Sequence, residues 1–220
     1  MTAFDPERAR FNMVEQQIRP WEVVDPRVLD VLQRVPRDPF TPPAYRALAY
    51  ADIEVPLAHG ETMLAPKIEA KLLQALEIQP TDRVLEIGTG SGYLTACLAH
   101  LGGHVVTIDW HADFVAEAQV RLAELGIANV EFVTGDAFAA DLPGAPFDVI
   151  AVTGSVPILP ARFQALLNEG GRLFAVVGEP PAQEATLLTR VRGEVYRREA
   201  LFETVISPLA NAPKPAAFVF

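Results

Sequence analysis

A chain of 220 residues, of which 50% are hydrophobic and 21% are charged, has the length and composition of one globular domain with a substantial core. Its net charge is −10 and its 18 Lys and Arg residues form no basic run, so we expect no nucleic acid partner, because duplex binding requires clustered cations. The single cysteine excludes a disulfide framework, and no segment has the roughly 18 uncharged apolar residues of a membrane span, so we expect a cytoplasmic protein without membrane contact.

The N-terminal part of the chain is expected to form short helices followed by a loop. Asp5-Pro6 and Asp25-Pro26 each place an acidic residue at a helix N-cap and a proline at the first helical position. Residues 52–65 then lack a clear period and predict an irregular loop. We therefore expect one domain with two parts, an N-terminal helical segment with this loop at residues 1–65 and a core at residues 66–220.

The core sequence alternates between short apolar strands and helices. This alternation is typical of a Rossmann-like α/β fold, a mostly parallel, doubly wound sheet with right-handed crossovers. Towards the C-terminus the pattern changes to antiparallel strands, expected at residues 194–202 and 204–206, with residues 217–220 at the sheet edge. We expect core strands at residues 84–87, 104–109, 130–133, 147–152 and 171–177, and helices at residues 66–76, 93–101, 112–125 and 160–167.

The strongest motif is a glycine-rich turn between the first core strand and the helix that follows it. Glu86 precedes Gly88, Gly90 and Gly92, and such glycines let backbone N–H groups approach a ligand at the positive end of a helix. A dinucleotide fingerprint, G-x-G-x-x-G, would need glycine at position 93, which is Tyr93. The Gly-x-Gly-x-Gly form resembles instead the first motif of S-adenosylmethionine enzymes, in which the turn surrounds the amino-acid end of the cofactor.

Two acidic residues follow the next two strands. Asp109 ends its strand 21 residues after Gly88 (109 − 88), close to the separation of about 20 residues at which an acid binds the ribose hydroxyls in Rossmann sheets, although a helix N-cap is the alternative. Asp136 is placed either to bind the adenine amino group or to stabilise a turn. Because the carboxyl ends of parallel strands share one edge of a sheet, we expect both acids to join Glu86 and the glycines in one S-adenosylmethionine site.

Three stretches carry a resemblance to a known family: residues 35–40 with Pro-Arg-x-x-Phe, residues 60–66 with Gly-x-Thr-x-x-x-Pro, and the glycine turn within residues 84–93. Over roughly residues 13–209 the chain resembles protein-L-isoaspartate O-methyltransferases. The resemblance implies a monomeric, S-adenosylmethionine-dependent enzyme that methylates the α-carboxylate of L-isoaspartyl residues in damaged proteins. A carboxylate with a pKa of about 3.5 is already ionised, so we expect catalysis by alignment and exclusion of water and assign no general base.

The loop that the resemblance assigns to the methyl acceptor departs from the family pattern. The family has Thr-Ile-Ser-x-Pro where this chain has Thr62-Met63-Leu64-Ala65-Pro66, and leucine cannot donate the hydrogen bond of the serine. Losing a hydrogen bond to a charged group, about 1.5–3 kcal/mol, costs roughly one to two orders of magnitude in affinity or rate. The resemblance places Thr62 and Leu64 beside the acceptor. Ser155 is the candidate to replace the lost hydroxyl, and a Gly-Ser turn before Pro157 is the alternative. The resemblance places Ser207-Pro208-Leu209 in a C-terminal segment on the acceptor side, with the same two alternatives.

Two other functions stay open at this point. One is a divergent methyltransferase of a small carboxylic acid or another metabolite, with Leu64 lining an apolar pocket; the other is a binding module that keeps the cofactor but has lost turnover. Cys97 is expected in the core and His59 as a loop residue. We expect no metal site and no histidine base, because the histidines are scattered, at His59, His100, His104 and His111.

Overall fold

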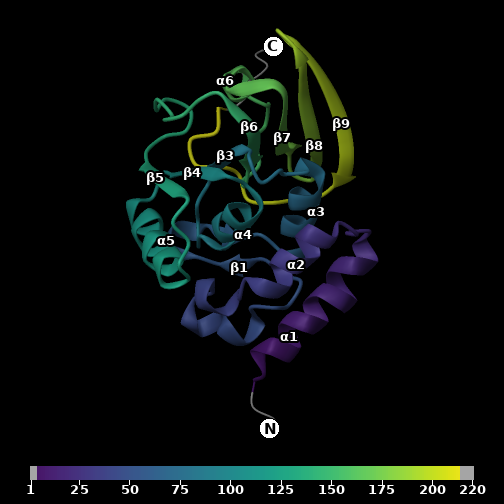
Figure 1. The fold of residues 1–220 in the computed structure, drawn as a ribbon, viewed down its shortest axis with the longest axis vertical. Helices are drawn as coiled ribbons and strands as arrows, with labels where there is room; N and C mark the ends of the chain where they lie inside the picture. The colour runs from purple at the N-terminus through teal and green to yellow at the C-terminus, as the bar shows by residue number, and fades with distance from the viewer. Residues whose placement is uncertain (1–3, 214–220) are drawn as a thin grey trace, which may run out of the picture.

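The computed structural model describes residues 4–213, with a twisted sheet above the N-terminal helices in the view of Figure 1. A short π-helix lies at residues 13–18, and short 3₁₀-helices lie at residues 19–21, 38–40, 43–48 and 58–60. The α-helices are α1 (Pro6–Asn12), α2 (Pro26–Arg34), α3 (Pro66–Leu76), α4 (Tyr93–Leu101), α5 (Ala112–Glu124) and α6 (Ala161–Ala165). The strands are β1 (Val55–Pro56), β2 (Thr62–Met63), β3 (Arg83–Ile87), β4 (His104–Asp109), β5 (Val130–Thr134), β6 (Phe147–Val152), β7 (Leu167–Glu179), β8 (Ala182–Arg192) and β9 (Val195–Glu203).

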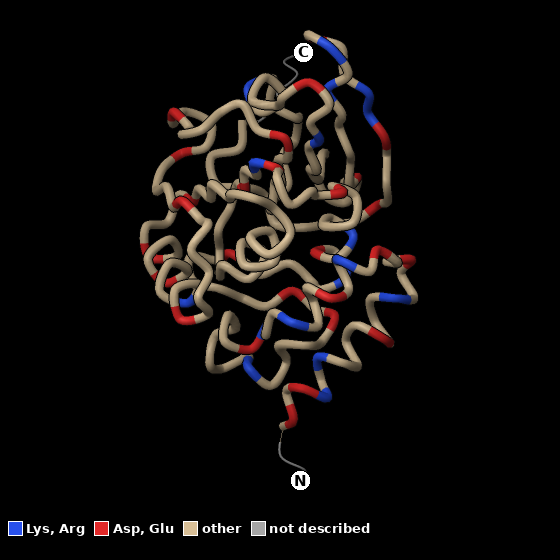
Figure 2. Tube along the Cα trace, in the orientation of Figure 1, with Lys and Arg blue, Asp and Glu red and all other residues tan. Residues whose placement is uncertain are grey.

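The first two helices begin at the caps that the sequence predicts. The Asp5 carboxylate accepts a hydrogen bond from the Arg8 backbone N–H at 3.1 Å, and the Asp25 carboxylate accepts one from the Arg27 N–H at 2.8 Å. In both helices proline occupies the first position, where its missing N–H costs nothing. Acidic and basic residues are interspersed along these N-terminal helices (Figure 2).

The sheet confirms the predicted Rossmann-like α/β fold. Within residues 4–213 it has seven strands in the order β5-β4-β3-β6-β7-β8-β9. The strands from β5 to β7 in this order pair in parallel, whereas β7, β8 and β9 pair antiparallel. The chain runs outward from β3 to β5 and then returns to the other side of β3. This reversal is the topological switch point at which open α/β sheets bind ligands.

Helices and loops cover both faces of the sheet. On one face, Leu72 of α3 and Leu98 of α4 pack with Val84 of β3 in a large hydrophobic cluster. On the other face, Phe163 of α6 packs in a second cluster with Leu85, the next residue of β3. Neighbouring residues of a strand point to opposite faces, so the two layers account for the continuous apolar runs of the parallel strands.

The C-terminal part of the sheet corrects the sequence-based prediction. β7 continues into a long hairpin with β8, a strand that the sequence analysis missed, and residues 204–206 form no strand. The β8 pattern was hidden because two of its inward positions carry the polar residues Gln183 and Thr186, which are nevertheless buried. β9 agrees closely with the strand expected at residues 194–202. The edge strand expected at residues 217–220 lies outside the described residues.

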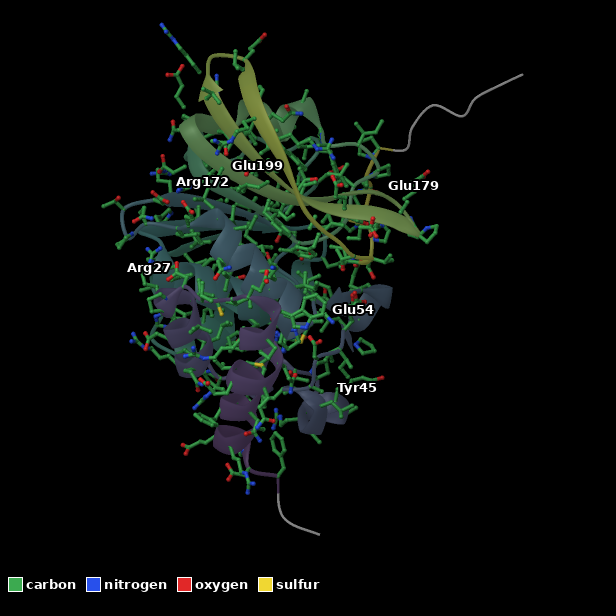
Figure 3. The ribbon with its side chains drawn as sticks, turned by 90° about the vertical axis from the view of Figure 1, so that its right-hand side faces the viewer. Arg27, Tyr45, Glu54, Arg172, Glu179 and Glu199 are labelled. Atoms are coloured by element: carbon green, nitrogen blue, oxygen red, sulfur yellow. The ribbon has the colours of Figure 1, made fainter. Side chains whose placement is uncertain are left out.

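The loop at residues 52–65 is also more regular than expected, because β1 and β2 pair antiparallel across a turn at residues 58–60. Figure 3 shows this region from the side, with Glu54 lying between the N-terminal helices and the β7–β8 turn at Glu179. Among residues 4–213, none of the helices combines the length and the hydropathy that a membrane span requires.

Candidate functional site

A cavity opens at the carboxyl ends of β3, β4 and β5, beside the switch point of the sheet. The empty space within it, together with the open solvent at its mouth, amounts to about 910 Å³. Its walls come from segments far apart in the sequence: residues 57, 61–64, 69, 86–91, 94, 108–111, 114, 135–138, 153–154 and 207–210.

The three glycines of the turn have different structural tasks. Gly88 and Gly90 line the cavity, and Gly88 has a φ of +99° with the hydroxyl of Thr153 only 2.2 Å from where a Cβ would lie. Gly92 also has a positive φ, of +86°, but a Cβ there would lie 2.7 Å from the Cβ of Ala118 in α5. The structure therefore places Gly92 behind the cavity wall, where it allows α4 and α5 to pack closely.

Asp109 connects β4 to the glycine turn. One carboxylate oxygen accepts the Gly90 backbone N–H at 2.8 Å and the other accepts the His111 N–H at 2.9 Å. The N-cap of α5 is His111, so the alternative assignment of Asp109 as this N-cap does not apply. Each carboxylate oxygen keeps a further lone pair, and Asp109 lines the cavity, so it remains able to accept hydrogen bonds from hydroxyl groups.

Asp136 stabilises a turn and also lies in the cavity wall. Its Oδ1 accepts the backbone N–H of Phe138 at 2.8 Å, as in an Asx-type turn. Asp136 and Gly135 also line the cavity. A turn of this kind fixes the carboxylate at the cavity wall, so the structural and the binding interpretation are compatible.

Glu86 is fully buried, and its carboxyl group has one unused oxygen. Oε2 accepts hydrogen bonds from the hydroxyls of Thr95 and Thr107, the latter at 2.7 Å, whereas Oε1 has no partner. Burial raises the pKa of Glu86 to about 8, although the two hydroxyls oppose the rise. Because Glu86 lines the cavity, its unpartnered oxygen suits a positively charged donor of a bound molecule.

Another part of the cavity wall carries a pair of hydroxyls. Thr62 Oγ1 lies 3.3 Å from Ser207 Oγ and 3.4 Å from a carboxylate oxygen of Glu54. Thr62, Ser207 and the buried Leu64 all line the cavity. Thr62 and Ser207 are 145 residues apart, so this pair has no signature in the local sequence.

Ser155 lies elsewhere than we expected. Its hydroxyl donates to the backbone carbonyl of Ile206 at 3.1 Å and accepts from the Gln183 side chain at 3.0 Å. Ser155 is buried and does not line the cavity. Both hydrogen bonds connect neighbouring segments, so this geometry gives Ser155 a structural role, whereas Ser207 lines the cavity.

A buried ion pair that the sequence analysis did not single out holds the loop in place. Arg37, in the Pro-Arg-x-x-Phe motif, pairs with Glu69 of α3 and donates to the backbone carbonyl of Leu64 at 2.6 Å. The guanidinium also lies 4.7 Å from the ring centre of Tyr93. Burial raises the pKa of Glu69 to about 7, and the Arg37 charge limits the rise. Arg37 thus fixes the position of Leu64 at the cavity wall.

Cys97 lies where the sequence predicts, whereas His59 makes a contact that the sequence does not predict. Cys97 is fully buried in α4, which confirms it as a core residue. His59 does lie in the loop, but its ring stacks on that of His111 with 4.1 Å between the ring centres. The sequence separation of 52 residues (111 − 59) gives no hint of this contact.

Comparison with known proteins agrees with the fold and the cavity. Residues 8–212 match the model of the family described as Protein-L-isoaspartate(D-aspartate) O-methyltransferase (PCMT). A protein-L-isoaspartate O-methyltransferase of Rhodopseudomonas palustris is 41% identical over 210 residues, covering 93% of this chain and 96% of the relative. One from Koribacter versatilis is 39% identical over 197 residues, covering 90% and 88%.

Solved structures show the same fold. A protein-L-isoaspartate O-methyltransferase structure superimposes with a TM-score of 0.78 and 25% identity, covering 94% of this chain and 67% of the other. A Plasmodium falciparum structure of the same description, in complex with S-adenosyl-L-homocysteine, gives a TM-score of 0.80 at 23% identity, covering 94% and 98%.

The order of the strands, the glycine turn and the acid-lined cavity of this protein together define an S-adenosylmethionine-dependent methyltransferase. The cofactor predicted from the glycine turn is thereby confirmed. More particularly, the chain belongs to the protein-L-isoaspartate O-methyltransferase family.

Proposed function

We propose that this protein transfers the methyl group of S-adenosylmethionine to the α-carboxylate of L-isoaspartyl residues in damaged proteins. The observation that carries the proposal is the cavity itself, which joins an acid-lined wall at the switch point to a hydroxyl-bearing wall. Relatives at 39% and 41% identity that bear the name of this activity support the same substrate class.

The acid-lined wall would hold the cofactor, which supplies an electrophilic methyl group on a cationic sulfur. Asp109 has free lone pairs for the ribose hydroxyls, and Asp136 is placed for the adenine amino group. The unpartnered Oε1 of Glu86 suits the ammonium group of the methionine part. Gly88 contributes a wall without a side chain, because a Cβ would collide with Thr153.

The hydroxyl-bearing wall would hold the acceptor. A carboxylate is ionised at neutral pH, so the side chains need only orient it and keep water away. Thr62 and Ser207 place two hydroxyls within 3.3 Å of each other, and each can donate one hydrogen bond to the two oxygens of a carboxylate. We assign to Ser207 the role that the family gives to the serine at the position of Leu64.

Paired peptides test the proposal. An isoaspartyl peptide and its aspartyl twin are incubated with labelled S-adenosylmethionine, and methyl ester is expected on the first peptide alone. Esterification of both peptides or of neither contradicts the proposed substrate. If the cofactor binds and neither peptide reacts, a screen of small carboxylic acids tests the alternative that the buried Leu64 lines a pocket for a metabolite.

The assignment of Ser207 has a separate test. Ser207→Ala should raise the KM for the isoaspartyl peptide about tenfold or more and leave the Kd of the cofactor unchanged, because one hydrogen bond to a charged group is lost. Leu64→Ser introduced into the Ser207→Ala protein restores the hydroxyl from the neighbouring wall and should recover part of this loss. An unchanged KM in Ser207→Ala contradicts the role.

A further inference from the structure

Four side chains that can bind metal ions meet at the mouth of the cavity. His59 and Glu61 lie in the loop that joins β1 and β2, and His111 and Asp113 lie where β4 leads into α5. His59 Nε2 is 2.7 Å from Asp113 Oδ2, and His111 Nε2 is 3.7 Å from Glu61 Oε1. One ligand atom each from His59, His111 and Asp113 lie within 4.8 Å of one another. Two short segments thus bring two imidazoles and two carboxylates together.

The side chain of Phe114 holds both imidazole rings in place. Their planes are 5° from parallel. Both rings contact the edge of Phe114, with ring centres 5.4 Å from His59 and 5.3 Å from His111. Phe114 is buried, so it is a fixed support that orients both rings, in the way that neighbouring groups orient metal ligands. The polar ends of the cluster remain accessible, with 41% of the His59 and 51% of the Asp113 side chain exposed.

We propose that His59, His111 and Asp113 bind a transition-metal ion of the Zn²⁺ type, with Glu61 as the fourth ligand. Two imidazole nitrogens with carboxylate oxygens are a donor set that suits Zn²⁺, whereas Mg²⁺ and Ca²⁺ prefer oxygen ligands alone. Tetrahedral Zn²⁺ with bonds of about 2.0–2.2 Å places its ligand atoms roughly 3.3–3.5 Å apart. The separations of 2.7 and 3.7 Å lie on either side of this spacing. To complete the ligand set, the two stacked rings turn towards the ion and Glu61, which lies outside the group of ligand atoms within 4.8 Å, moves towards it.

A metal ion at this position would act on the cofactor site. His111 and Glu61 line the cavity, and the His111 backbone N–H donates to the Asp109 carboxylate at 2.9 Å. The ion would therefore fix the β1–β2 loop against the start of α5, next to the acid assigned to the ribose. By thermodynamic linkage, metal and cofactor then change each other's affinity by the same factor. This coupling rests on the proposed cofactor contacts, whereas the metal site itself does not.

Calorimetric titration of the tag-free, metal-depleted full chain with ZnCl₂ tests the site. We expect one Zn²⁺ per chain, and binding at least about tenfold weaker in His59→Ala and in His111→Ala, because each removes a direct ligand. Asp113→Asn keeps the side-chain shape and should also weaken binding. His104→Ala is the matched control, since His104 forms an exposed pair with Glu131 at 3.7 Å at the other end of β4 and should leave Zn²⁺ binding unchanged.

Two results would overturn the metal site. The first is that the wild type shows no saturable Zn²⁺ binding. The second is that a His59→Ala/His111→Ala double variant with a native circular dichroism spectrum binds Zn²⁺ as tightly as the wild type. Repeating the titration with saturating S-adenosylhomocysteine measures the coupling. An unchanged Zn²⁺ affinity there contradicts the coupling alone. Failure of S-adenosylhomocysteine to bind either with or without Zn²⁺ would contradict the proposed cofactor contacts and leave the metal site standing.

Discussion

Replacing Glu86 by glutamine should remove the pH dependence of cofactor binding. Burial raises the pKa of Glu86 to about 8, so the free protein holds this carboxyl group protonated at neutral pH. A ligand with an ammonium group beside the unpartnered Oε1 favours the ionised form, and binding below pH 8 therefore releases a proton. The affinity should rise with pH by up to about tenfold per unit and level off above pH 8.

The magnitude at high pH follows from the lost charge. A hydrogen bond to a charged group contributes about 1.5–3 kcal/mol, so Glu86→Gln should weaken binding at pH 8.5 by roughly 10- to 150-fold. At pH 6 the carboxyl group of the wild type must first lose its proton, so the difference in cofactor affinity between the two proteins should be smaller.

The same raised pKa of Glu86 makes the unliganded fold less stable as the pH rises from 4.5 to about 8, because the folded chain binds more protons than the unfolded chain.

Calorimetric titration with S-adenosylhomocysteine from pH 6 to pH 8.5 measures these affinities, and buffers of different ionisation enthalpy count the released protons. Asp109→Asn is the comparison: it should weaken binding at every pH and keep a slope, with the levelling-off at a lower pH, because Glu86 is intact but loses the Asp109 charge that helps to raise its pKa. Parallel pH profiles of the wild type and Glu86→Gln would refute the reasoning. So would a wild-type profile without any slope.

Three further predictions concern the fold around the site. Arg37→Met should lower the free energy of unfolding in urea by about 3–5 kcal/mol, because it leaves the buried Glu69 carboxylate without its partner; a loss below about 1 kcal/mol contradicts this. Gly92→Ala should lower the melting temperature more than Gly193→Ala, since both have a positive φ but only at Gly92 would the new Cβ lie 2.7 Å from another side chain; equal losses would contradict this. Cys97 is fully buried and burial raises its pKa, so a thiol reagent should label it only at the rate of unfolding, and rapid labelling of the native protein would exclude this packing.

Those parts of the site that lie at strand ends could be predicted from the sequence. Glu86, Asp109 and Asp136 lie at or just beyond the carboxyl ends of three consecutive parallel strands, and the geometry of such a sheet brings these ends to one edge. The roles of individual glycines could not be predicted, because Gly90 and Gly92 look equivalent in the motif. Only the packing of α4 on α5 shows that Gly92 lies behind the wall.

Long-range contacts were beyond the reach of sequence patterns. β8 was missed because buried polar residues such as Gln183 interrupt its apolar pattern, and Gln183 is buried only because Ser155 and the Ile206 backbone satisfy its amide group. The stacking of His59 on His111 likewise joins two segments that no spacing relates. In each case the deciding contact partner lies in another segment of the chain.

Leu64 shows why the loss of a motif residue does not by itself decide the function. The motif serine would act through the position of its hydroxyl in the cavity, and a cavity wall is built from several segments. Arg37 fixes the backbone at Leu64, so the wall keeps its place although its side chain is apolar. Ser207, from the segment after β9, brings a hydroxyl within 3.3 Å of Thr62 and can bind the same carboxylate. The position of a donor in space, rather than its place in a motif, therefore determines whether the acceptor is held.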